Sequence, residues 1–255
     1  MKLEFLGTGA ADFNLERDQH SEGFRRFSSA LLDDKLLLDP GPHIFHYMET
    51  YRKPTLFDNL EYVLITHSHG DHMDMNSVMR IHEMRPDCRF YGSEATARSF
   101  WGTGIPFTVI LPYNDYQLGD YCVTPLRSSH AGAPDEITYV YSVVCNGKKL
   151  FYGADTGLLP AQSWDYIYRR GYDLFVMELT IGDYDDAPHL FSHMTLPTFR
   201  LMVKLIDKKK LTVKENGRFL TTHMARNWHK PHADLAEQLA PMGVTPAYDG
   251  MTVEV

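Results

Sequence analysis

The segment HSHGDH at residues 67–72 restricts this chain more than any other part of its sequence. It follows Glu61–Thr66, a short, mostly apolar and β-branched run that predicts a buried strand. Imidazole and carboxylate groups make poor core filler, because a buried polar group without a partner costs about 1–3 kcal/mol. They are ligand types for Zn²⁺, and also for manganese or iron. A solvated histidine-rich loop is the alternative, but the position after a strand favours a site for two adjacent cations.

Three more ligand-type residues, His130, Asp155 and His223, each follow a segment that predicts a strand. Singly each is a weak signal, since Asp155 also fits a turn or helix cap and His223 a helix-cap partner. Together they supply the ligands that residues 67–72 lack for two ions. Seven other histidines are expected to be surface or hydrogen-bonded core residues: His20, His43, His46, His82, His189, His229 and His232.

The distribution of strand and helix patterns indicates a layered fold. Strand patterns form clusters, and helix patterns at 43–51, 161–169, 196–208 and 231–239 lie between them. This arrangement favours two sheets with helices outside over a regular βαβ alternation. With 255 residues, no internal repeat and no long linker, the chain is expected to be one domain over residues 1–255.

Composition narrows the class of protein and its partners. The net charge of −8 argues against strong nucleic-acid binding, which needs lysine and arginine to displace counterions. A small phosphate-bearing substrate in a locally positive pocket stays compatible with it. No apolar run approaches the roughly 18 residues of a membrane span. The three widely spaced cysteines form no disulfide framework, so a cytoplasmic location is expected.

At this point the sequence resembles the metallo-β-lactamase-fold hydrolase superfamily, whose motif order is HxHxDH, His, Asp, His. Residues 5–10 (FLGTGA), 25–30 (RRFSSA), 37–41 (LLDPG) and 192–195 (SHMT) are similar to segments of the branch that contains ribonuclease Z and the PhnP-type phosphodiesterases. The resemblance covers essentially the whole chain. It implies an α/β (α+β) fold, a four-layer αββα sandwich of two mixed sheets with helices outside.

The resemblance also assigns roles to individual residues. It implies two divalent ions, Zn²⁺ as the first expectation and Mn²⁺ as the second, that share a water or hydroxide. Their ligands would be His67, His69 and His130 for the first ion, Asp71, His72 and His223 for the second, and Asp155 for both. Asp71 is also expected to serve catalysis. His193 would be a proton donor or transition-state contact, and Glu178 would orient it.

These features predict a metal-dependent phosphodiesterase for a small nucleotide or cyclic phosphate, with a metal-bridging hydroxide as nucleophile. Alternatives are a hydrolase of carboxylic esters, lactones or thioesters, and a metal-binding module with little turnover. Processing of tRNA is disfavoured by the negative charge and by the lack of a Gly-Pro-rich arm. Surface positions are expected for Arg25, Arg26 and Arg226, with a phosphate clamp as the alternative. A homodimer is one option for the assembly.

Overall fold

The structure, a computed structural model, describes residues 1–184, 191–207 and 212–255. The described residues form two sheets of seven strands each. In spatial order the first sheet comprises β14 (Thr252–Glu254), β1 (Lys2–Gly7), β2 (Ser29–Leu32), β3 (Leu36–Leu38), β4 (Tyr62–Leu64), β5 (Arg89–Gly92) and β6 (Phe107–Val109). The second comprises β13 (Val244–Pro246), β12 (Val213–Thr222), β11 (Tyr172–Glu178), β10 (Lys148–Gly153), β9 (Tyr139–Cys145), β8 (Tyr121–Arg127) and β7 (Tyr116–Leu118).

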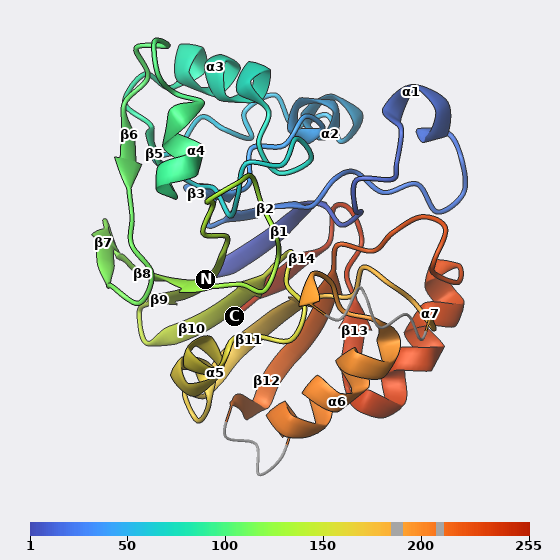
Figure 1. Cartoon of the computed structure of the whole chain (residues 1–255). Coiled ribbons are helices and arrows are strands. Elements are labelled where there is room, and N and C mark those ends of the chain that lie inside the picture. The colour runs from blue at the N-terminus through green and yellow to red at the C-terminus, as the bar shows by residue number, and fades with distance from the viewer. Residues whose placement is uncertain (185–190, 208–211) are drawn as a thin grey trace.

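Helices cover the outer faces of both sheets (Figure 1). On the first sheet lie α2 (Ile44–Thr50), α3 (Met75–Met84) and α4 (Glu94–Arg98). On the second lie α5 (Ala161–Ile167), α6 (Leu196–Asp207) and α7 (His232–Leu239), the last followed by the 3₁₀ turn η3 (Ala240–Met242). The short α1 (Leu15–Asp18) stands apart from these layers. The predicted αββα sandwich is confirmed.

The alternation of side chains along each strand explains why the layers stack in this way. In a strand, successive side chains point to opposite faces. Leu36 and Leu38 of β3 therefore join the core between the two sheets, whereas Leu37 joins the core under α2 and α3. A third core lies between the second sheet and α5, α6 and α7. Three apolar layers thus hold four layers of secondary structure together.

Both sheets mix strand directions, as the resemblance implied. In the second sheet, β7 to β10 are antiparallel neighbours, whereas β10, β11, β12 and β13 run parallel. The carboxyl ends of β8, β10, β11 and β12 therefore lie along one edge of this sheet. In the first sheet, β3 to β6 are parallel. This topology brings the predicted ligands near one another, because each of them follows the carboxyl end of a strand.

Some elements differ from the sequence expectations. The segment 12–27, expected as a loop, contains α1, whose Asn14 side chain caps the helix by accepting from the Arg17 N–H. The strands β5, β7 and β13 were not predicted, and β12 begins at Val213 rather than Arg218. No helix in the described ranges has both the length and the apolar character needed to cross a membrane.

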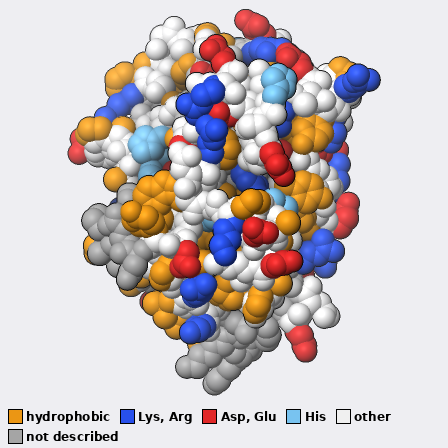
Figure 2. Space-filling model, turned by 90° about the vertical axis from the view of Figure 1, so that its right-hand side faces the viewer, with side chains coloured by type: hydrophobic (Ala, Val, Ile, Leu, Met, Phe, Trp, Pro, Cys, Tyr) orange, Lys and Arg blue, Asp and Glu red, His pale blue; other side chains and the backbone are white. Residues whose placement is uncertain are grey.

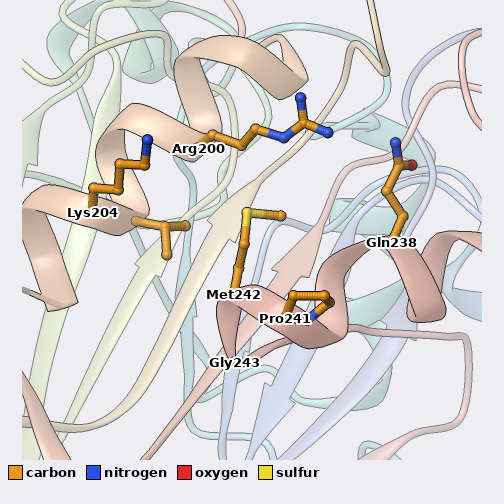
Figure 3. Close-up of a pocket in the computed structure, with 7 residues that line it drawn as sticks. Arg200, Lys204, Gln238, Pro241, Met242 and Gly243 are labelled. Carbon is orange, nitrogen blue, oxygen red and sulfur yellow. The ribbon is translucent and has the colours of Figure 1, made fainter.

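The outer helical layer of the second sheet carries a surface hollow of about 550 Å³ (Figure 3). Its lining residues, from α6, α7, η3 and the residue after η3, are Arg200, Val203, Lys204, Gln238, Pro241, Met242 and Gly243. None of these is a predicted ligand, so the hollow is separate from the predicted centre. On the face drawn in Figure 2, acidic and basic side chains are interspersed with one another over the described residues.

Candidate metal centre

The segment 67–72 begins shortly after β4, which ends at Leu64. Its start is fixed by Asp39, whose carboxylate accepts from Thr66 N at 2.7 Å and from Thr66 Oγ1 at 2.9 Å. Gly41 lies so close to the segment that a Cβ there would stand 2.3 Å from the carbonyl oxygen of Asp71. The LLDPG stretch therefore packs directly beneath the histidine-rich turn and holds its shape.

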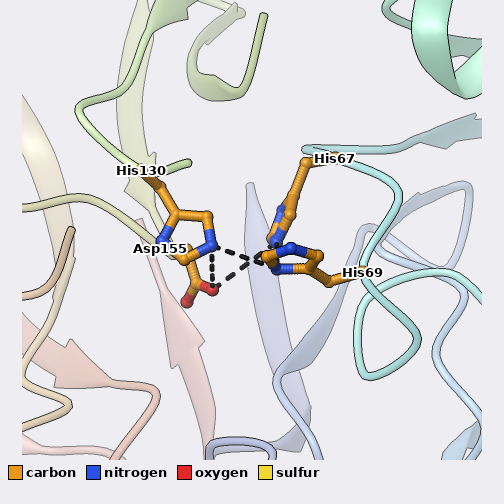
Figure 4. A group of neighbouring side chains, drawn as sticks. All are labelled: His67, His69, His130 and Asp155. Atoms are coloured by element: carbon orange, nitrogen blue, oxygen red, sulfur yellow. Dashed lines mark hydrogen bonds and ion pairs between the residues drawn. The ribbon is translucent and has the colours of Figure 1, made fainter. Parts of the chain in front are cut away.

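Four side chains form a first cluster, drawn in Figure 4: His67, His69, His130 and Asp155. His69 Nδ1 lies 2.9 Å from His67 Nε2 and 3.1 Å from His130 Nε2. Asp155 Oδ2 lies 3.5 Å from His67 Nε2 and 3.4 Å from His130 Nε2. His130 belongs to the segment after β8 and Asp155 to the segment after β10, so the two sheets meet at this cluster.

A second cluster shares Asp155 and adds Asp71, His72 and His223. His72 Nε2 lies 3.2 Å from His223 Nε2, 3.3 Å from Asp71 Oδ2 and 3.4 Å from Asp155 Oδ2. His223 Nε2 lies 2.8 Å from Asp155 Oδ1 and 3.5 Å from Asp71 Oδ2. All four side chains are buried. The structure thus brings together all the residues for which the sequence predicted a ligand role.

The donor set of the two clusters fits divalent ions. Tetrahedral ligands at 2.0–2.1 Å from Zn²⁺ lie about 3.3 Å from one another, and the separations above run from 2.8 to 3.5 Å. Each neutral imidazole has one N–H, so nitrogens packed this closely cannot all be satisfied by donating to each other. Asp155 is buried, and its Oδ1 lies 2.8 Å from His223 Nε2, a nitrogen that also faces the cluster. Cations would satisfy these lone pairs.

The nitrogens that face away from the clusters are held by other groups. His72 Nδ1 lies 2.8 Å from Asp39 Oδ2, and His223 Nδ1 lies 2.7 Å from Thr180 Oγ1. His130 Nδ1 lies 3.1 Å from the carbonyl oxygen of Ser192 and donates to it. Such contacts orient each ring and leave its Nε2 lone pair for an ion.

Burial and neighbouring charges shift the pKa values of the clustered groups. Burial would raise the pKa of Asp71, but His72 and His223 hold it well below its ordinary value. The same two histidines hold the pKa of buried Asp155 well below its usual range. Burial lowers the pKa of His223, but Asp155 and Asp71 outweigh it and raise the value to about 10. Two buried carboxylates therefore stay anionic at neutral pH and favour cations.

His193 borders both clusters. Its ring centroid lies 4.8 Å from that of His130 and 5.7 Å from that of His223. Its Nδ1 lies 3.1 Å from Glu178 Oε1, and its side chain keeps 20% of its surface exposed. Burial lowers the pKa of His193, but the charge and hydrogen bond of Glu178 outweigh this and raise it. The predicted pairing of His193 with Glu178 is present in the structure.

Glu178 is fully buried at the end of β11, where several donors fix it. Its Oε1 accepts from Thr156 N at 2.7 Å, and its Oε2 accepts from Thr180 N at 3.0 Å and Met194 N at 3.2 Å. The Thr180 hydroxyl also donates to Oε2. A carboxylate held by this many donors cannot swing away, so the direction of the His193 ring is fixed as well.

Sequence reasoning missed two carboxylates that support the centre. Asp39 was noted only within the LLDPG stretch, although its contact with His72 is the shortest outer contact of that ring. Glu136 was not singled out, yet its carboxylate accepts from both Ser68 N and Ser68 Oγ. Asp39 could have been found from its position between an apolar strand pattern and Pro-Gly. For Glu136 we find no sequence signal that would have indicated its role.

The three arginines differ from their expected surface positions. Arg26 is buried, with 5% of its surface exposed, so that prediction was wrong: it pairs with Asp249, whose Oδ2 lies 3.2 Å away. Arg25 is half-buried and donates to Thr8 Oγ1 at 2.7 Å. Arg226 is half-buried and pairs with Asp18 at 2.7 Å.

Among the histidines that were expected to be surface or hydrogen-bonded core residues, one lies inside the described core. His43 is buried, accepts from Phe27 N at 3.2 Å and stacks on the Phe27 ring at 4.0 Å, as a hydrogen-bonded core residue should. His20 is exposed. His189 lies outside the described residues.

A family model described as the β-lactamase superfamily domain matches residues 34–224, a range that contains all the clustered side chains. The chain belongs to this superfamily. As a metallo-β-lactamase-fold protein it belongs to a family of hydrolases, and that fold implies divalent metal ions. Among curated proteins there is no match.

Solved structures of other metallo-β-lactamase-fold proteins share the fold of this one at low sequence identity. A diphosphatase from the PhnP family is 19% identical with a TM-score of 0.72, covering 100% of this chain and 97% of its own. Human tRNase Z, short form, is 19% identical with a TM-score of 0.71, at 100% and 99% coverage. Zn²⁺-bound PqqB from Methylobacterium extorquens is 18% identical with a TM-score of 0.77, at 100% coverage of both chains.

Proposed function

We propose that this protein is a two-metal hydrolase of small phosphodiesters, with a nucleotide or cyclic phosphate as substrate. The observation that carries the proposal is the pair of ligand clusters that share Asp155, with His193 beside both of them. His67, His69 and His130 would hold one ion, Asp71, His72 and His223 the other, and Asp155 would contact both. When bound, the ions supply an activated water and polarise the attacked phosphoryl oxygen.

The residues of the chain supply the remaining steps. His193 Nδ1–H donates to Glu178 Oε1 at 3.1 Å, so a second proton on the ring resides on Nε2. Burial lowers the pKa of His193, but the charge and hydrogen bond of Glu178 outweigh it and raise the pKa, which favours the doubly protonated ring. We assign this imidazolium as the general acid that donates its Nε2 proton to the leaving oxygen of the substrate.

The fixed carboxylates keep the site organised while the proton moves. Glu178 is held by Thr156, Thr180 and Met194, so it can stabilise the imidazolium without reorienting. Asp39 holds the His72 ring in the same manner. Preorganised groups of this kind need no rearrangement at the moment of reaction.

The comparisons support a phosphate ester and zinc as starting points. One structural relative is named a diphosphatase, a second a tRNase and a third is Zn²⁺-bound. The net charge of −8 and the mixed charges of the surface in Figure 2 favour a small phosphate ester over RNA. Zinc is therefore the first ion to test and manganese the second.

The test combines elemental analysis with a substrate panel. Protein loaded with Zn²⁺ or Mn²⁺ should bind two equivalents and cleave bis(p-nitrophenyl) phosphate or a cyclic nucleotide. His130→Ala should bind one ion less and lose turnover, whereas His20→Ala, at an exposed position, should do neither. Turnover of lactones, thioesters or carboxylic esters alone would refute the phosphodiesterase proposal. Two bound ions without turnover of any ester would indicate a metal-binding module.

A further inference from the structure

Glu136 lies outside both clusters but holds together the segments that carry the first one. Its Oε1 accepts from Ser68 N at 2.9 Å, Ser93 Oγ at 3.2 Å and Thr96 Oγ1 at 3.0 Å. Its Oε2 accepts from Ser68 Oγ at 2.7 Å and Ala133 N at 2.9 Å. A carboxylate offers about four lone-pair sites, so these donors saturate it. Glu136 therefore has no capacity left to ligate an ion itself.

The positions of these donors tie the two sheets together. Ser68 stands between His67 and His69 after β4 of the first sheet, and Ser93 precedes α4 on the same side of the sandwich. Glu136 belongs to the segment between β8 and β9 of the second sheet, which also carries His130. The three histidines of the first cluster thus reach their common position through segments that this one carboxylate joins.

Gly132 provides separate support for a fixed position of Glu136. A Cβ at residue 132 would stand 2.4 Å from Glu136 Oε2 and 2.9 Å from the Thr138 methyl group. The segment after His130 therefore wraps closely around the carboxylate. Thr138 in turn donates from its hydroxyl to the carbonyl oxygen of His130 at 2.9 Å, which fixes the backbone of that ligand.

The second cluster depends on other groups. Its His72 ring contacts Asp39 at 2.8 Å, and its His223 ring contacts Thr180 at 2.7 Å. Among the described residues, Glu136 makes no hydrogen bond to either ring. Thr66 serves both clusters, since its Oγ1 lies 3.0 Å from His67 Nδ1 and 3.5 Å from His72 Nδ1. The hydrogen bonds of Glu136, by contrast, reach only segments that carry the first cluster.

We propose that Glu136 is a positioning residue that sets the metal affinity of the first cluster and leaves that of the second unchanged. The inference rests on the metal centre of the proposed function but not on its phosphodiesterase activity. Removing a group hydrogen-bonded directly to a metal ligand typically lowers metal affinity about 10–100-fold. Because Glu136 holds the segments that carry the ligands and not the rings themselves, we expect the lower end of this range, about 10-fold. We expect that change in one of the two bound equivalents.

The variant Glu136→Gln tests this sharply. Each oxygen of Glu136 accepts a backbone N–H, from Ser68 on one side and Ala133 on the other. A backbone N–H cannot become an acceptor, so either orientation of the glutamine amide places its NH₂ group against a donor. Competition with a chromophoric chelator, for Zn²⁺ and for Mn²⁺, should show one equivalent weakened about 10-fold and the other unchanged.

Three controls identify which equivalent is affected. Glu94→Gln, at an exposed position nearby, should leave both affinities at the wild-type values. Thr180→Val should weaken the other equivalent, since Thr180 Oγ1 contacts His223 Nδ1 at 2.7 Å. In a His130→Ala background, where the first cluster lacks a ligand, Glu136→Gln should cause no further loss for the equivalent that remains.

Equal weakening of both equivalents by Glu136→Gln, or of neither, would overturn the inference. If this variant does not fold, Ser68→Ala serves instead, because it removes only the hydroxyl contact at 2.7 Å. It should weaken the same equivalent by a smaller factor, and unchanged affinity would also refute the proposal. Wild-type protein that binds two ions but cleaves no phosphodiester would refute the proposed activity and leave this inference standing.

Discussion

Replacing His193 with alanine should slow phosphodiester cleavage by a factor that depends on the leaving group. His193 Nδ1 is held by Glu178 at 3.1 Å and its side chain is 20% exposed, so its other nitrogen is placed to serve a substrate. A positioned general acid contributes about 10²–10⁴-fold. At about 1.36 kcal/mol per tenfold change, this corresponds to about 2.7–5.4 kcal/mol of transition-state stabilisation.

The assay compares two esters of one nucleoside 5′-phosphate. Methanol leaves as a strongly basic alkoxide that needs a proton, so His193→Ala should lose the full factor with the methyl ester. The p-nitrophenolate ion is stable without a proton, so the variant should lose less than about tenfold with that ester. Metal content should equal that of the wild type, and His20→Ala should behave as the wild type with both esters.

The comparison separates the two roles that the resemblance allowed for His193. An equal loss with both esters would refute proton donation and identify His193 as a transition-state contact. An unchanged rate with the methyl ester would remove His193 from the reaction altogether. Loss of bound metal in the variant would show instead that the ring supports the clusters.

Three further results are expected. Because the general acid must be protonated, the rate of methyl-ester cleavage should fall as pH rises through the pKa of His193, which Glu178 raises. Glu178→Gln should therefore move this alkaline limb of the pH–rate profile to lower pH. Gly41→Ala should lower the midpoint of thermal unfolding and weaken metal binding, since its Cβ would stand 2.3 Å from the Asp71 carbonyl oxygen. Calorimetry measures the midpoint and chelator competition measures the metal affinity. Wild-type values in both assays would contradict the packing argument. Chelation of bound metal should lower the free energy of unfolding. The loss should be about 2.7 kcal/mol for each site that had been kept at a free metal concentration of 100 times its Kd. Denaturant titration that shows no difference would contradict a role for metal in this fold.

The sequence allowed the ligand positions to be predicted because the relevant signals are local. The motif at 67–72 is contiguous, and His130, Asp155 and His223 each follow an apolar strand pattern. Parallel strands in one sheet end along the same edge, so residues after those ends converge without any further information. The αββα order followed from the resemblance.

The supporting residues could not be predicted, since their roles depend on partners far away in the chain. Glu136 contacts Ser68 from 68 residues away, and the sequence around Glu136 has the appearance of an ordinary turn. Arg26 is buried beside Asp249, which lies 223 residues later in the chain, and its guanidinium also donates to His46 Nδ1 at 3.1 Å. Neither pairing leaves a periodic or motif signal.

The early start of β12 has a similar cause. Glu215, Asn216 and Gly217 lie inside this strand, although residues of these types usually disfavour strands. The pairing with β11 shifts register between Tyr172 and Leu174, which accommodates the extra residues. The neighbouring strand, and not local propensity, thus decides where β12 begins.

The candidate ligands are drawn from both halves of the sandwich: those of residues 67–72 from the first sheet, and His130, Asp155 and His223 from the second. An ion in either cluster would therefore resist any motion that separates the halves, and any such motion would release the ion. Loss of metal and separation of the two halves would then be linked, so that each favours the other.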